Sequence, residues 1–156
     1  MRTIDEIVEY YRLEQSADFF GFVAEVLFPF LPFDKAKEWL KEDATAEEWG
    51  EVEELTRESV LEWMRDYMEF AWSKARNHRG LSAGRSVDKM RAWLWLLGDD
   101  ELVTFASGRR NYSQYGVPIL KAICEKYDFP MPADKGVERM AQGLPCCRDC
   151  NMGCGR

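Results

Sequence analysis

The feature that most constrains the fold of this chain is the stretch from Thr45 to Gly80, which contains no proline and one internal glycine. Glu48 follows Thr45 by three residues, the spacing of a capping box in which each side chain bonds the other's backbone N–H. Basic residues fill the far end, where the helix dipole favours cations, and Gly80 is suited to end a helix. The pattern predicts one long helix over residues 45–79, about 45–50 Å in length.

The second half of this stretch is apolar over most of its circumference. Apolar residues recur there at three- and four-residue steps along two neighbouring lines, formed by Val60, Trp63, Met64, Tyr67 and Ala71 and by Leu61, Met68, Trp72 and Ala75. A helix with so wide an apolar surface is buried between other helices. A second, uninterrupted apolar run extends to Leu97. We therefore expect Trp93 to Leu97 and Val60 to Trp72 to form the core.

Acidic residues on the same predicted helix also recur at helical spacing. Steps of three, four or seven residues place one line of carboxylates along it, made up of Glu47, Glu51, Glu54, Glu58, Glu62 and Glu69. Like charges four residues apart repel each other and weaken a helix slightly. The line has two interpretations, a solvated outer face or a docking face for a partner protein with a basic surface.

Charge is distributed unevenly along the 156 residues. Residues 1–69 carry 7 Lys and Arg against 19 Asp and Glu, whereas residues 70–156 carry 14 against 9. The two halves can neutralise each other within the fold or across a homodimer, or face different partners. Acids near the N-terminus do not fit a secretory signal, and the apolar run Val26 to Phe33 is too short to span a membrane. We expect a cytoplasmic protein without a membrane partner.

Capping and helix-breaking residues divide the rest of the chain into shorter predicted helices, over residues 3–15, 16–27, 34–40, 86–97, 99–105, 118–127 and 134–143. The predicted caps include a capping box of Thr3 with Glu6, then Ser86, Asp99 and Asp134, and Pro118 is predicted in a first helical turn. Ser82 to Gly84 are predicted as a linker. No segment alternates with a two-residue period, so no strand is predicted. The sequence thus predicts an all-α protein of seven to eight helices around the long one, with a compact domain over residues 1–143 and a cysteine-rich tail over residues 144–156.

Four cysteines lie within nine residues of that tail: Cys146, Cys147, Cys150 and Cys154. Thiolates at such spacings can converge on a zinc ion. Three of them are also spaced like ligands of an iron–sulfur cluster, and a tail without metal is the third interpretation. We predict a structural zinc site, because crowded exposed thiols without a ligand are prone to oxidation.

Basic residues form a second group, consisting of Arg76, Arg79, Arg85, Lys89, Arg109 and Arg110. Tyr112 and Tyr115 flank the last two, and arginine with tyrosine suits contacts to phosphates and bases. Alternatively, these cations complement a helix C-terminus and pair with the acidic half of the chain.

Groups typical of catalysis are few. His78 is the only histidine, and its place near a predicted helix end favours capping. Neither a glycine-rich phosphate loop nor a nucleophile elbow is present. The sequence therefore favours a non-enzymatic helical interaction module, an adaptor or inhibitor that presents the acidic line to a basic partner. The alternative is a nucleic-acid-binding protein that uses the basic group and a cysteine-bound metal.

Overall fold

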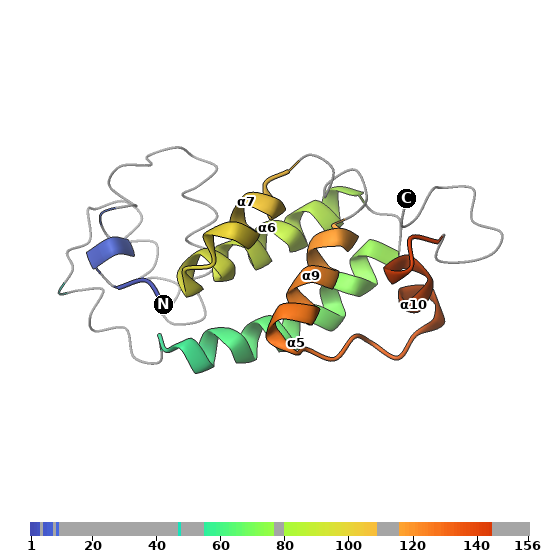
Figure 1. Ribbon diagram of the computed structural model, residues 1–156, viewed down its shortest axis with the longest axis horizontal. Helices are drawn as coiled ribbons and strands as arrows, with labels where there is room; N and C mark the ends of the chain where they lie inside the picture. Colours follow the sequence, from blue (N-terminus) through green and yellow to red (C-terminus); the bar gives the residue numbers. More distant parts are fainter. Residues whose placement is uncertain are drawn as a thin grey trace.

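The structure is a computed structural model that describes residues 1–3, 5–7, 9, 47, 55–76, 80–108 and 116–144, with residues 80–85 as backbone only. All regular structure in these residues is helical, and no strand occurs among them (Figure 1). The predicted all-α class is confirmed. Residues 10–46, over which further helices are predicted, and the cysteines of the tail lie outside the described residues.

The prediction of one continuous helix over residues 45–79 is wrong. Helix α5 spans Arg57–Arg76, and the two residues before it, Leu55 and Thr56, are not helical. The backbone N–H of Ser59 donates to Thr56 Oγ1 at 3.2 Å, and that of Thr56 donates to Ser59 Oγ at 3.0 Å. This reciprocal pair is a capping box with serine at its third helical position, so a new helix starts where the sequence pattern predicted an unbroken one.

Helix α6 spans Gly80–Leu97, so the linker predicted at Ser82 to Gly84 is wrong. Ser86, predicted as a helix cap, instead lies inside α6 with 2% of its surface exposed. Its hydroxyl oxygen accepts a 3.4 Å hydrogen bond from the hydroxyl of Tyr67 on α5. Burial of the apolar face of α6 outweighs the low helix propensity of these small residues, since propensity is a weak determinant beside packing.

Helices α5 and α6 run side by side in opposite directions and hold the centre of the core (Figure 1). The predicted core is confirmed: both apolar segments are buried. The buried side chains include Val60, Met64, Met68, Ala71 and Trp72 on α5 and Ala92, Trp93, Leu94, Trp95 and Leu96 on α6. Five consecutive buried residues on α6 mean that other elements cover it on several sides.

Helix α7 spans Asp100–Ala106 and folds back along α6. Gly98, with a φ of 78°, ends α6, and the N–H of Asp99 donates to the Leu94 carbonyl at 2.9 Å, the bond typical of a Schellman ending. Asp99 then caps α7 by accepting the N–H of Leu102 at 3.1 Å. The predicted cap at Asp99 is confirmed.

Helix α9 spans Val117–Tyr127 and packs against both α5 and α7. Pro118 lies in its first turn, as predicted, where the missing N–H costs nothing. Asp128 ends the helix in the left-handed conformation, with a φ of 56°. The extended segment that follows leads to helix α10, Lys135–Ala141, which packs on α5 and α9 and is capped by Asp134 as predicted.

The start of the chain is attached to the far end of α6. Thr3 and Glu6 form the predicted capping box, with bonds of 2.7 Å and 3.2 Å. The N–H of Arg2 donates to the Leu96 carbonyl at 2.8 Å. No helix in the described ranges is both long and apolar enough to traverse a bilayer.

Candidate interaction surface

Helix α5 places three of the acidic residues on one exposed face. Glu58, Glu62 and Glu69 are separated by four and seven residues, so they project from the same side of α5, and all three are exposed. We call these three residues the acidic face. Glu47 is helical and exposed but is separated from α5 by the break at Leu55 and Thr56, and Glu51 and Glu54 lie outside the described residues.

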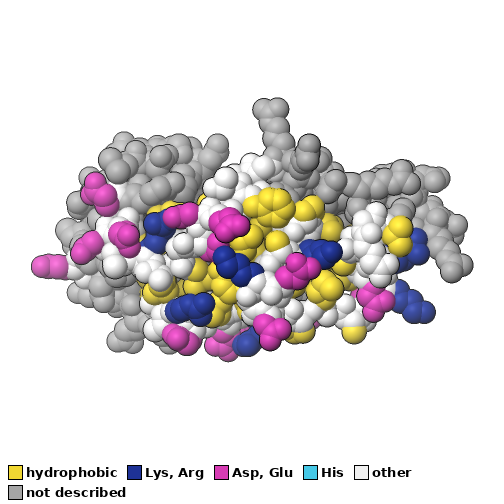
Figure 2. Space-filling model, in the orientation of Figure 1, with side chains coloured by type: hydrophobic (Ala, Val, Ile, Leu, Met, Phe, Trp, Pro, Cys, Tyr) yellow, Lys and Arg dark blue, Asp and Glu magenta, His cyan; other side chains and the backbone are white. Residues whose placement is uncertain are grey.

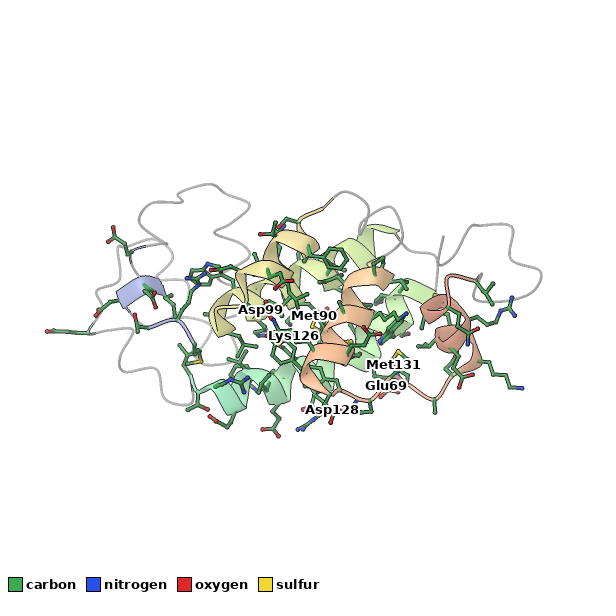
Figure 3. All side chains as sticks on the ribbon, in the orientation of Figure 1. Glu69, Met90, Asp99, Lys126, Asp128 and Met131 are labelled. Atoms are coloured by element: carbon green, nitrogen blue, oxygen red, sulfur yellow. The ribbon has the colours of Figure 1, made fainter. Side chains whose placement is uncertain are left out.

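The acidic face leads into a hollow between α5 and the connection from α9 to α10. The hollow has a volume of about 420 Å³ and is lined by Arg65, Glu69, Pro130, Met131, Pro132, Ala133 and Asp134. A second hollow of about 180 Å³ shares Glu69, Pro132 and Asp134 with the first and extends towards Ser73, Arg76 and Val137. We call the two together the α5–α10 groove. In Figure 3 the labels place Glu69 and Met131 beside each other where α5 meets this connection.

Prolines shape the outer wall of the groove. Pro130 and Pro132 fix their own backbone and bias the residues before them towards extended conformations, so the connection stays non-helical after Asp128. Met131, between them, leaves 43% of its surface exposed. The wall is therefore an apolar, extended strip opposite a helix that carries charges.

An ion pair joins the two sides at the inner end of the groove. Arg76 on α5 pairs with Asp134, the cap of α10, which also accepts the N–H groups of Gly136 at 2.8 Å and Val137 at 3.3 Å. The hydrogen bond from Arg76 and these backbone bonds hold the pKa of the Asp134 carboxyl below its ordinary value. The pair fixes the spacing between α5 and α10.

The described basic residues do not form one site. Arg76 faces the groove, whereas the ammonium of Lys89 lies 4.9 Å from the ring centre of Tyr67 and 5.4 Å from that of Trp93. Tyr67 and Arg76 are nine residues apart, which places them on opposite sides of α5 at 100° per residue. The side chain of Arg85 and residues Arg79, Arg109 and Arg110 lie outside the described residues.

A lysine–aromatic cluster occupies the side of α5 opposite the groove. Phe70 is 46% exposed, its ring centre lies 5.2 Å from that of Tyr67, and the ammonium of Lys74 lies 4.8 Å above it. Tyr67 packs edge-on against Trp93 of α6 at 5.4 Å. Tyr67, predicted in the apolar core, is partly buried against that core and also borders this exposed cluster. The four-residue step from Phe70 to Lys74 is the sequence signal for the cluster.

A polar network lies between the ends of α6 and α9. Asp99, only 8% exposed, accepts the Tyr127 hydroxyl at 2.6 Å and pairs with the Lys126 ammonium at 2.7 Å (Figure 3). Burial raises the pKa of Asp99, but the bonds from Lys126 and Tyr127 outweigh it and lower that pKa overall. Burial and the Asp99 carboxylate raise the pKa of Tyr127, so Tyr127 stays a neutral donor. The network joins helices and is a structural feature.

Charged side chains of both signs surround a central band of hydrophobic ones on the face drawn in Figure 2. Along the lower edge of that view, where α5 runs in Figure 1, acidic side chains recur with a few basic ones between them. Acidic side chains therefore lie at the lower margin of this view, along the helix that forms one side of the groove.

The predicted metal site lies outside the described residues, with Cys146, Cys147, Cys150 and Cys154. Within the described ranges, no three His, Cys, Asp or Glu side chains are grouped to hold a metal ion. Cys124 is buried on α9, and burial raises the pKa of its thiol. This position is that of an inert core thiol.

Comparison with protein-family models, with curated proteins and with solved structures found no match for this chain. The acidic face, the groove and the lysine–aromatic cluster are the features of the described surface that bear on its function.

Proposed function

We propose that this chain is a non-enzymatic helical interaction module, an adaptor or inhibitor, whose acidic face docks a partner protein with a basic surface. The single observation that supports this most is the exposure of Glu58, Glu62 and Glu69 on one side of α5, next to a groove with an apolar wall. Charge alone attracts many cations, whereas charge beside a shaped apolar groove favours particular partners.

The physical role of the acidic face is to raise the rate of encounter and to fix orientation. Complementary charges on two proteins raise the rate at which they associate, whereas ion pairs at the rim of the interface add little to the final affinity. A net charge of −7 reinforces this steering towards cations. Because α5 is anchored by buried side chains along its other side, the three carboxylates keep a fixed spacing.

The test compares two triple variants of the full chain. In one, the acidic face is reversed by Glu58→Lys, Glu62→Lys and Glu69→Lys. The matched control reverses three exposed acids elsewhere, Glu9→Lys, Glu101→Lys and Glu125→Lys, so the net charge of both variants is equal. Proteins captured from cells by the unchanged chain are purified and their affinity for each variant is measured.

The acidic-face variant should bind such a partner at least about tenfold more weakly than the control, and binding of the unchanged chain should weaken with salt. Equal losses in the two triple variants would mean that net charge, and not this face, attracts the partner. A partner whose affinity is unchanged in both variants would also contradict the proposal.

The lysine–aromatic cluster favours a second candidate function, binding of single-stranded nucleic acid. Phe70 is exposed, and Lys74 and Lys89 hold ammonium groups near the aromatic rings of this cluster. Bases stack on exposed aromatic rings while lysines neutralise phosphates. This surface is separate from the acidic face, so the two functions are independent.

Binding of a mixed-sequence DNA oligonucleotide, titrated with salt, tests the second candidate. Affinity should fall steeply as salt rises, and Phe70→Ala should weaken binding more than Phe105→Ala, a matched change at another exposed phenylalanine. Absence of binding at low salt would exclude this function.

A further inference from the structure

We infer that the α5–α10 groove holds an extended segment of the basic partner, with a Lys or Arg side chain paired to Glu69 and a neighbouring apolar side chain packed on Met131. This inference rests on the proposed function and specifies the side chains that the docked segment of the partner must carry. It makes the groove the specificity-determining part of the docking surface.

The dimensions of the groove suit a short peptide. Its larger hollow of about 420 Å³ falls within the range of about 300–1,000 Å³ typical of ligand sites. The smaller hollow of about 180 Å³ continues it along α5, because Glu69, Pro132 and Asp134 line both. A continuous channel beside a helix accommodates an extended chain better than a compact ligand.

Glu69 supplies the negative charge at the junction of the two hollows. Arg76 and Asp134 are already paired with each other, and Asp134 is further committed to capping α10. Within the part of the chain that the structure describes, neither Glu69 nor Arg65 has an ion-pair partner within 4.0 Å. A cation from a partner would therefore find the Glu69 carboxylate free.

The opposite wall supplies apolar area and a backbone contact. Pro130, Met131, Pro132 and Ala133 line the larger hollow, and Met131 is 43% exposed. Among the described residues, the backbone N–H and carbonyl of Met131 have no hydrogen-bond partner. The flanking prolines lack an N–H, so Met131 can exchange one pair of backbone bonds with an extended peptide but cannot start a sheet.

The charge of the neighbouring acidic face favours a basic segment over an acidic one. Glu58 and Glu62 continue the line from Glu69 along α5, whereas Arg65 is the one cation among the described residues that line the larger hollow. A segment with further Lys or Arg residues would extend along α5, and an acidic segment would be repelled along the same path.

The experiment selects peptides from a random heptapeptide phage library on the full chain and measures the affinity of the enriched peptides. Two variants alter the groove: Glu69→Lys reverses its charge, and Ala133→Trp fills its volume at an exposed position. Glu101→Lys and Thr104→Trp make the same changes at exposed positions of α7, which packs on α6 and α9. Thermal unfolding verifies that each variant is folded.

Enriched peptides should carry Lys or Arg next to a large apolar residue. They should bind both groove variants at least about tenfold more weakly and bind both α7 variants as they bind the unchanged chain.

Three results would overturn the inference. In the first, Glu58→Lys combined with Glu62→Lys lowers the affinity for the enriched peptides, but neither groove variant does. This result would support the acidic-face function and exclude the groove. Enriched peptides without basic residues, insensitive to all acidic changes, would contradict both proposals. No enrichment above background would exclude the groove as a peptide site.

Discussion

The hydroxyl of Tyr127 donates to Asp99 Oδ2 at 2.6 Å, which joins the end of α9 to the start of α7 across twenty-eight residues. Asp99 uses its other oxygen to cap α7 through Leu102. One carboxylate therefore holds two helices in position, and its partner Lys126 compensates its charge. Buried polar groups with all their bonds made fix the arrangement of the elements around them.

Tyr127→Phe should lower the free energy of unfolding by about 1–3 kcal/mol, because it removes a bond to a charged, buried acceptor. Chemical denaturation monitored by circular dichroism measures this change. Lys126→Met is the comparison: the Lys126 side chain is half exposed, so removal of its charge should cost about 1 kcal/mol or less. A larger loss for Lys126→Met than for Tyr127→Phe would contradict the role given to the tyrosine.

The stability of the protein should fall in acid, in part through Asp99. The pKa of Asp99 is lower in the folded state than its ordinary value of 3.8. The stabilisation is thus fully present above that value and is lost as the pH falls through the lower, folded pKa. Asp134 and Glu6, whose pKa values are also lowered, contribute in the same direction.

Tyr127→Phe separates the contribution of Asp99 from the other two. Removing the hydroxyl should bring the folded pKa of Asp99 closer to its ordinary value, so the loss of stability below pH 3.8 should become less steep. Denaturation midpoints measured across this range provide the comparison. Identical pH profiles for the variant and the unchanged chain would refute the coupling.

Among the described glycines at positive φ, Gly116 has the least room for a side chain. Its φ is 76°, and a Cβ added there would lie 2.0 Å from Val87 Cγ2 on α6. Gly116→Ala should therefore destabilise by about 2–4 kcal/mol, from overpacking together with the left-handed backbone. The matched control is Gly98→Ala, which has a φ of 78° but no atom within 4 Å and should cost about 1 kcal/mol. Equal melting temperatures of the two variants would be inconsistent with this packing.

In the described residues from Gly98 onwards, local signals in the sequence predicted where the helices begin and end. Asp99, Pro118 and Asp134 act within three or four residues of their own position, so no tertiary information is needed to interpret them. The break before α5 was not predicted, although it also depends on neighbouring residues. Thr56 and Ser59 cap each other, but serine in place of Glu or Gln is a weak capping-box signal.

Features that depend on which helices pack together could not be predicted. Arg2 donates through Nε to the Trp95 carbonyl at 2.9 Å, stacks 4.7 Å from its ring and pairs with Asp100, but ninety-odd residues separate it from these partners. The groove is similar: periodicity gives the face of α5 on which Glu69 lies, but only the packing of α10 brings Met131 opposite to it.

The last prediction concerns zinc binding by the four tail cysteines. We expect at least three of Cys146, Cys147, Cys150 and Cys154 to bind one zinc ion, because thiolates at these spacings can reach a common metal and Gly153 and Gly155 permit the turns. Gly143 ends α10 in a left-handed turn, with the N–H of Leu144 donating to the Arg139 carbonyl at 2.9 Å, and Pro145 follows. In the sequence, the cysteine cluster therefore begins after the C-terminal cap of α10.

Replacing all four cysteines by serine should abolish bound zinc, measured by elemental analysis of the purified protein, and change the melting temperature little, because Gly143 and Pro145 separate the cluster from α10 in the sequence. Cys124→Ser is the control: it should leave zinc bound but destabilise the fold, because it places a hydroxyl in an apolar site. Iron in place of zinc would indicate an iron–sulfur cluster. A native preparation without metal and with four freely titrating tail thiols would end the prediction, and a large loss of helix on adding a chelator would show that the metal stabilises the domain itself.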